Sequence, residues 1–171
     1  MNIEATTPPG FISVIDNVTT RLAQAAMWLT LAMVLMTVAI VILRYAFEIG
    51  AIPLQESVMY MHGIVFLIGI PYGVRQNTHV RVDIFYTRLA PRHQTLIDLF
   101  GHVTFLLPLA TFIMISSWPY TLASWRVLEG SAEVGGIPAI FLLKTLIPVA
   151  AGLLLAQSIA EILKKIWMLR A

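Results

Sequence analysis

Residues 22–43 read LAQAAMWLTLAMVLMTVAIVIL, a run of 22 residues without a charged side chain. A helix rises about 1.5 Å per residue and the hydrocarbon core of a bilayer is about 30 Å thick, so a helix of this length crosses a membrane. Backbone polar groups in lipid must be satisfied within their own segment, which makes helix the expected conformation. Three further stretches have the same character, namely residues 57–74, 99–125 and 134–160, the last broken only by Lys144.

The four stretches predict an all-α membrane protein with four transmembrane helices. We place the spans at residues 22–44, 56–75, 95–123 and 137–162. They form one membrane domain, residues 22–163, between an N-terminal segment, residues 1–21, and a basic tail, residues 164–171. Apolar residues from Phe11 to Leu22 recur roughly on one helical face, which predicts an interfacial helix ahead of the first span. A frayed tail is the alternative for this segment.

The composition excludes several classes of protein. The chain has 171 residues, of which 58% are hydrophobic and 12% are charged, whereas soluble domains carry about 25% charged residues. The formal net charge is only +2, and it is placed at span ends, which favours membrane lipids over nucleic acid as the partner. There is no cysteine and no phosphate-binding glycine loop, HExxH or GxSxG motif, so we expect no enzyme activity.

The basic residues predict the orientation in the membrane. With four spans, the N-terminal segment, the second loop and the tail share one side and carry eight Lys and Arg residues, against two on the other side. The positive-inside rule then places both termini and the second loop of this multi-pass protein in the cytoplasm. We expect the second loop to be anchored at the membrane surface by four residues: Arg75, His79, Arg81 and Asp83.

One charged residue, Lys144, lies inside a predicted span. An intramembrane charge is a functional hypothesis by default, and the alternative is a structural pair with Glu56, Glu129 or Glu133 near the same membrane face. The sequence favours the structural pair. Six residues are our candidates for polar contacts on the periplasmic side: Arg44, Glu56, Arg126, Glu129, Ser131 and Lys144.

Small residues at helical spacing mark two predicted packing seams. Gly69 and Gly73 lie in the run GIPYG of the second span, and Gly152, Ala156 and Ala160 recur at i, i+4 and i+8 in the fourth. The seams pack these four helices together, or one of them meets a helix of another subunit.

Two histidines raise the alternative of a haem- or quinone-binding membrane anchor. His62 and His102 are predicted to differ by roughly 15–20 Å along the membrane normal, whereas two ligands of one iron share a level. We therefore expect no cofactor. An absorbance spectrum of the purified protein distinguishes a haem-binding anchor from a protein without haem. A free-standing four-helix carrier is a further alternative, although the middle of the first and fourth spans is almost wholly apolar, without the converging polar groups of a transporter site.

Ordered features along most of the chain resemble one known family. Arg44-Tyr45 ends the first span, Glu56 opens the glycine-rich second span, and Arg75 precedes the run from His79 to Asp83. After the third span come Ser124-Trp125, Glu129, Ser131, Gly136-Ile137-Pro138 and Lys144. From about residue 22 to residue 163 the chain resembles the small membrane subunit, DctQ-type, of tripartite ATP-independent periplasmic (TRAP) transporters.

The resemblance implies a role and partners. Such a subunit pairs with a large TRAP membrane subunit that carries the substrate and sodium sites. A periplasmic solute-binding protein delivers the substrate, commonly an organic acid. The resemblance thus implies a non-catalytic scaffold. Gln55 stands where small subunits of this family often have a second acidic residue beside the one matched by Glu56.

Overall fold

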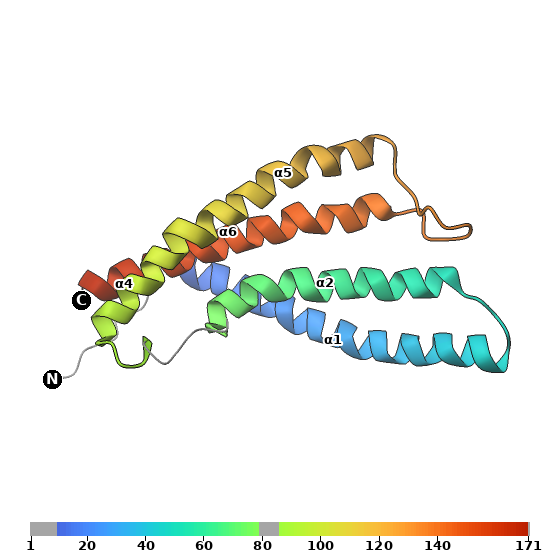
Figure 1. Ribbon diagram of the computed structural model, residues 1–171, viewed down its shortest axis with the longest axis horizontal. Helices are drawn as coiled ribbons and strands as arrows, with labels where there is room; N and C mark the ends of the chain where they lie inside the picture. The colour runs from blue at the N-terminus through green and yellow to red at the C-terminus, as the bar shows by residue number, and fades with distance from the viewer. Residues whose placement is uncertain (1–9, 79–85, 171) are drawn as a thin grey trace.

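The chain folds into long antiparallel helices (Figure 1). The computed structural model describes residues 10–78 and 86–170. The predicted all-α fold is confirmed, because four helical segments of this part of the chain are long and apolar enough to cross a membrane. The first two are α1 (Gly10–Ala46) and α2 (Ile52–Gln76). The third consists of α4 (Pro91–Gly101), the π-helical turn η1 (His102–Leu106) and α5 (Leu107–Arg126). The fourth is α6 (Ile140–Arg170).

The helices form two hairpins. Helix α1 packs against α2 in the first, and α5 packs against α6 in the second. The two hairpins meet where α2 packs against α6. Gly63 permits the close approach of α2 and α6, because a Cβ at this position would lie 3.1 Å from Leu143 Cδ1. The first turns of α1, the last turns of α6 and the described residues between α2 and α4 lie at one end, which we call the terminal end, and residues 47–51 and 127–139 lie at the other, the loop end (Figure 1).

The helices extend beyond the predicted spans. Helix α1 begins at Gly10, so residues 10–21 continue the first span and are neither a separate interfacial helix nor a frayed tail. Helix α6 continues to Arg170, so most of the predicted tail is helical. The fourth span begins at Ile140 instead of residue 137, because residues 130–138 fold into a loop. Ending a predicted helix at its first charged residue underestimates the length of a helix whose terminal charges have partners inside the protein.

A π-helical turn interrupts the third span at His102–Leu106. Pro108 lies two residues after this turn, and it has no N–H for the carbonyl group of Thr104, which its ring would also crowd. A wider turn before a proline relieves this conflict without ending the helix. The third span thus remains continuous from Pro91 to Arg126.

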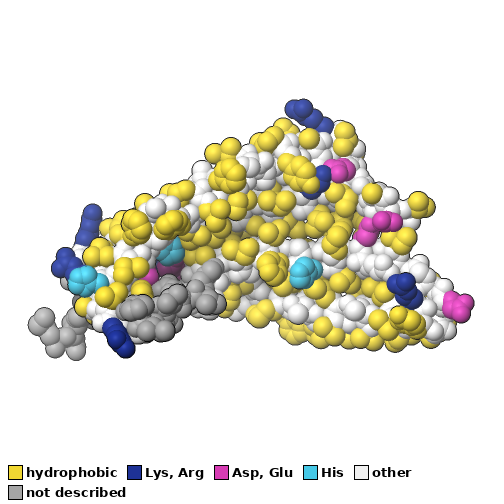
Figure 2. Space-filling model, viewed as in Figure 1, with side chains coloured by type: hydrophobic (Ala, Val, Ile, Leu, Met, Phe, Trp, Pro, Cys, Tyr) yellow, Lys and Arg dark blue, Asp and Glu magenta, His cyan; other side chains and the backbone are white. Residues whose placement is uncertain are grey.

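Large apolar side chains cover the outside of the helices (Figure 2). Trp28 on α1 is 74% exposed and Phe112 on α5 is 67% exposed, whereas the buried core is limited to a few residues such as Val74, Ala110 and Leu154. Soluble monomers rarely expose apolar surface on this scale. The exposed apolar surface therefore faces lipid or another membrane protein.

Candidate functional site

Glu56 joins α2 to the loop between α5 and α6. Its carboxylate accepts hydrogen bonds from the Ser131 hydroxyl group and from the backbone N–H of Ile137. The loop closes on itself, since Ser131 N–H donates to the carbonyl group of Ile137 at 3.1 Å. Gly136 leaves room for this contact, because a Cβ there would lie 2.6 Å from Glu56 Oε1. One carboxylate therefore fixes both arms of the loop against α2.

Lys144 pairs with Glu129, one of the three carboxylates that the sequence offered. Lys144 Nζ donates to Glu129 Oε2 at 2.6 Å and lies 4.2 Å from the centroid of the Tyr120 ring. The hydrogen bond from Lys144 holds the pKa of Glu129 below its usual value of 4.5. The ion pair is therefore complete at neutral pH and is lost as the pH falls below that value. We call Glu56, Glu129, Ser131 and Lys144 the loop-end cluster.

Two of the six predicted periplasmic contacts lie outside this cluster. Arg44 and Arg126 end α1 and α5, and both side chains are exposed, without a hydrogen bond or ion pair to the residues that the structure describes. Each lies in the last turn of its helix, where a cation interacts favourably with the helix dipole. Lys144 is the fifth residue of α6, which places it about 6 Å from the start of the helix.

A denser polar cluster lies at the terminal end, among α1, α2 and α6. Asp16 accepts hydrogen bonds from Gln157 Nε2 at 3.0 Å and Lys164 Nζ at 2.9 Å, and Arg75 Nε lies 3.6 Å from it. Lys164 also pairs with Glu161 at 2.6 Å. Gln157 is fully buried and accepts a hydrogen bond from Thr19 at 3.0 Å. We call Asp16, Thr19, Arg75, Gln157, Glu161 and Lys164 the terminal-end cluster.

The adjacent lysine of α6 contacts a different helix. Lys165 Nζ donates to Asp98 Oδ2 at 2.6 Å, and the Tyr86 hydroxyl group donates to Asp98 Oδ1 at 3.0 Å. Asp98 is on α4, so the Lys164-Lys165 pair ties α6 to both α1 and α4. Both lysines belong to the predicted basic tail, whereas both form ion pairs within the protein.

The predicted loop anchors fall into two groups. Arg75 turns toward Asp16 within the protein, instead of pointing only to lipid headgroups as we predicted. His79, Arg81 and Asp83 lie outside the described residues, so their anchoring role stays a prediction.

The sequence interpretation missed the terminal-end cluster, although a signal was present. Gln157, Glu161 and Lys164 recur at i, i+4 and i+7 of α6, which puts them on one face of an otherwise apolar helix. Polar residues at this spacing within a lipid-embedded helix need partners on neighbouring helices. Asp16 could have been proposed as that partner if residues 10–21 had been taken as part of the first span.

The predicted packing seams meet different surroundings. Gly69 has open space where a Cβ would stand, so it does not support a close helix contact within this chain. Gly73 lies near the end of α2, where its carbonyl group accepts a hydrogen bond from Thr78 N–H at 3.1 Å. Ala160 is fully buried and Ala156 is partly buried, whereas Gly152 borders a groove between α5 and α6. These small residues do not form one continuous seam.

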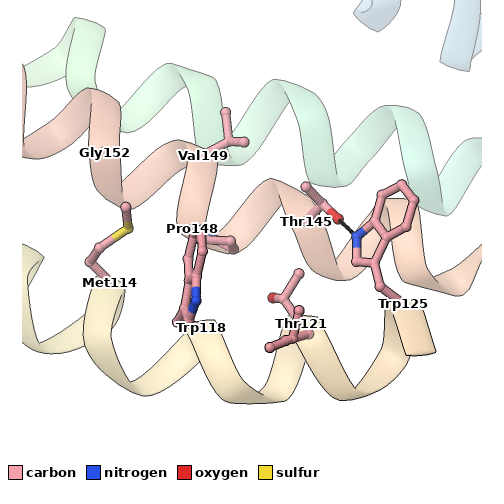
Figure 3. Close-up of a pocket in the computed structure, with 9 residues that line it drawn as sticks. Met114, Trp118, Thr121, Trp125, Thr145, Pro148, Val149 and Gly152 are labelled. Carbon is pink, nitrogen blue, oxygen red and sulfur yellow. Dashed lines mark hydrogen bonds between the residues drawn. The ribbon is translucent and has the colours of Figure 1, made fainter. Parts of the chain in front are cut away.

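The groove between α5 and α6 has a volume of about 480 Å³ and mostly apolar walls (Figure 3). Met114, Trp118, Pro148 and Val149 line it, with Trp125 at one end. Three polar atoms of its walls bond to one another or to backbone. Trp125 Nε1 donates to Thr145 Oγ1 at 2.8 Å, Thr145 Oγ1 donates to the Phe141 carbonyl group, and Thr121 Oγ1 donates to the Lys144 carbonyl group. The walls carry no charged side chain that could bind a charged solute.

The two histidines lie on different helices. His62 is in α2 with its ring 5.6 Å from that of Phe66, and His102 begins the π-helical turn. The third helical segment begins at Pro91, eleven residues before His102. Among residues 10–78 and 86–170, no three His, Asp or Glu side chains are grouped so that they could hold a metal ion.

These features define a four-helix membrane protein whose polar side chains mainly join its own helices and loops. Comparison with known proteins then identifies the family. Residues 33–167 match the family described as tripartite ATP-independent periplasmic transporters, DctQ component, and the chain belongs to this family. The resemblance drawn from the sequence is thus confirmed. No solved structure is significantly similar to the chain.

A curated relative agrees with this assignment. Over 89 residues the chain is 32% identical to a C4-dicarboxylate TRAP transporter small permease protein DctQ of Vibrio cholerae serotype O1. The match covers 52% of this chain and 38% of the relative. The family is a transport component and not a catalytic one, and its members are inner-membrane proteins. The chain is therefore a multi-pass inner-membrane subunit of a TRAP transporter.

Proposed function

We propose that this chain is a scaffold that supports a large TRAP permease subunit in the membrane. In this role it carries no substrate site of its own. The partner holds the substrate and sodium sites, and a periplasmic solute-binding protein delivers the substrate. An organic acid is the substrate class to test first, since the similar Vibrio cholerae protein is named for C4-dicarboxylates.

The observation that carries this proposal is the separation of polar and apolar residues. Among the residues that the structure describes, these charged pairs lie near the two ends of the molecule, and each links helices or loops of the chain itself. The groove between α5 and α6 is mostly apolar and carries no charged side chain, and the polar side-chain atoms of Thr121, Trp125 and Thr145 in its walls have partners. Transporter sites in membranes need converging polar groups near mid-depth. A scaffold needs apolar faces and fixed helix positions, which this chain has.

Purification and uptake together test the scaffold role. An affinity-tagged chain in mild detergent is expected to retain a larger multi-span membrane protein in equal amount. Deleting the chain is expected to reduce uptake of the organic acid to background, while the binding protein keeps its affinity for the acid. Full uptake by the large subunit and the binding protein alone, or transport by this chain reconstituted by itself, would contradict the proposal.

We also propose that the terminal end faces the cytoplasm. Exposed Arg21, Arg88, Arg92 and Arg170 lie toward that end, against Arg44 and Arg126 at the other, and this asymmetry supports the proposal. A reporter enzyme that is active only in the periplasm is expected to work when it is inserted between residues 47 and 51, and to be inactive when it is fused after residue 171. The reverse pattern would overturn the orientation.

A further inference from the structure

A second, smaller groove lies at the terminal end, between the first turns of α1 and the last turns of α6. Its volume is about 200 Å³. Phe11 and Ile12 line it from α1, and Leu163, Ile166, Trp167 and Arg170 line it from α6. The walls are therefore apolar, and Arg170 is the one charged residue among the six that line the groove.

The charge of Arg170 is not balanced within the protein, in contrast to the two lysines before it on α6. Lys164 pairs with Asp16 and Glu161, and Lys165 pairs with Asp98. Arg170 is exposed and has neither an ion pair nor a hydrogen bond to any residue that the structure describes. An anionic group bound at the mouth of the groove would balance this charge.

The size of the groove decides what kind of molecule fits it. An α-helix with its side chains is about 10 Å across, so a space of 200 Å³ holds less than one turn of a partner helix. A single flexible hydrocarbon chain fits such a space in part and continues along the apolar surface outside it. Trp167 belongs to the residue types that are enriched where headgroups meet hydrocarbon.

We propose that this groove binds one anionic phospholipid, with an acyl chain against Ile12 and Ile166 and the phosphate group at Arg170. The guanidinium group of Arg170 can donate two parallel hydrogen bonds to phosphate oxygens. A zwitterionic headgroup also has a phosphate group, but it carries no net negative charge to balance the charge of Arg170. Under the proposed orientation this lipid comes from the cytoplasmic leaflet, where anionic lipids attract basic residues next to the membrane.

Thermal unfolding of the full-length chain in detergent, together with any subunit that accompanies it, tests the site. Phosphatidylglycerol at ten times its Kd is expected to raise the Tm by about 3–6 °C, and phosphatidylcholine is expected to raise it less. Arg170→Gln should remove the difference between the two lipids. Ile166→Trp, which fills the groove and leaves Arg170 in place, should remove most of the shift. Arg126→Gln, an exposed arginine at the other end, is the matched control and should keep the whole response.

Each alternative gives a distinct result. Equal shifts with both lipids, or a full phosphatidylglycerol shift in Arg170→Gln, would overturn the proposal. A shift with glycerol phosphate alone would show that the site binds a soluble anion and would overturn the acyl-chain part. If Arg170→Gln lowered the lipid-free Tm and left the lipid response intact, Arg170 would serve only the C-terminal end of α6. These outcomes are independent of uptake, so they are distinguishable from a failure of the scaffold role.

Discussion

Replacing Asp16 with alanine is expected to destabilise the folded chain by about 3 kcal/mol, because the carboxylate joins three helices in a place largely shielded from water. Arg75 loses its acidic partner, Gln157 loses one acceptor, and Lys164 keeps only Glu161. For a chain of this size the loss corresponds to a fall in Tm of roughly 6–12 °C, measured on the purified protein in detergent. We also expect less full-length protein in membranes, since within this cluster α1 keeps only the Thr19–Gln157 hydrogen bond to α6.

Two further variants separate charge from shape at this position. Asp16→Asn keeps an acceptor for Gln157 and removes the charge, so an intermediate loss is expected. Asn17→Ala, an exposed polar neighbour on the same helix, is the control and should change the Tm little. A fall in Tm of the same size in Asn17→Ala, or no fall in Asp16→Ala, would show that the cluster does not hold α1.

The fold was predictable because lipid removes most alternatives to a helix. A chain with four long apolar stretches, of which only the fourth contains a charge, has one plausible architecture, and the structure has it. The ends of the helices were not predictable from hydropathy, because Arg21, Lys164 and Lys165 read as span boundaries although α1 and α6 continue past them. Two of these charges, Lys164 and Lys165, have partners on other helices, and sequence spacing alone does not give those partners.

Separation along the sequence explains which polar contacts could be predicted. Glu129 was a short-range candidate for Lys144, fifteen residues away and near the same membrane face, and the structure pairs them. Asp16 and Gln157 are 141 residues apart, so their contact depends on how α1 crosses α6. The π-helical turn was not foreseen either, although Pro108 was visible, because a proline is compatible with a kink, a wider turn or a helix end.

Replacing Glu56 with glutamine is expected to release the loop at residues 127–139, because one carboxylate accepts from two donors in different arms of that loop. Glutamine keeps one acceptor oxygen for the Ile137 N–H and presents an amide donor to the Ser131 hydroxyl group, so that hydroxyl has to accept instead of donate and the charge assistance of both hydrogen bonds is lost. A lost charge-assisted hydrogen bond of about 2 kcal/mol corresponds to roughly 30-fold faster hydrogen exchange at the backbone amides of Ser131 and Ile137. Hydrogen exchange with mass spectrometry on the purified protein measures this directly.

Gly136→Ala tests the same contact without changing the carboxylate. The added Cβ would lie 2.6 Å from Glu56 Oε1, which is too close, so the loop has to move and exchange at Ser131 should rise as in Glu56→Gln. Glu133→Gln is the control, because Glu133 is exposed on the same loop and its carboxylate has no partner among the described residues. If all three variants exchange alike, the loop is not held by Glu56. If only Glu56→Gln and Gly136→Ala open the loop and both also lose uptake, a fixed loop is part of what the subunit contributes to transport.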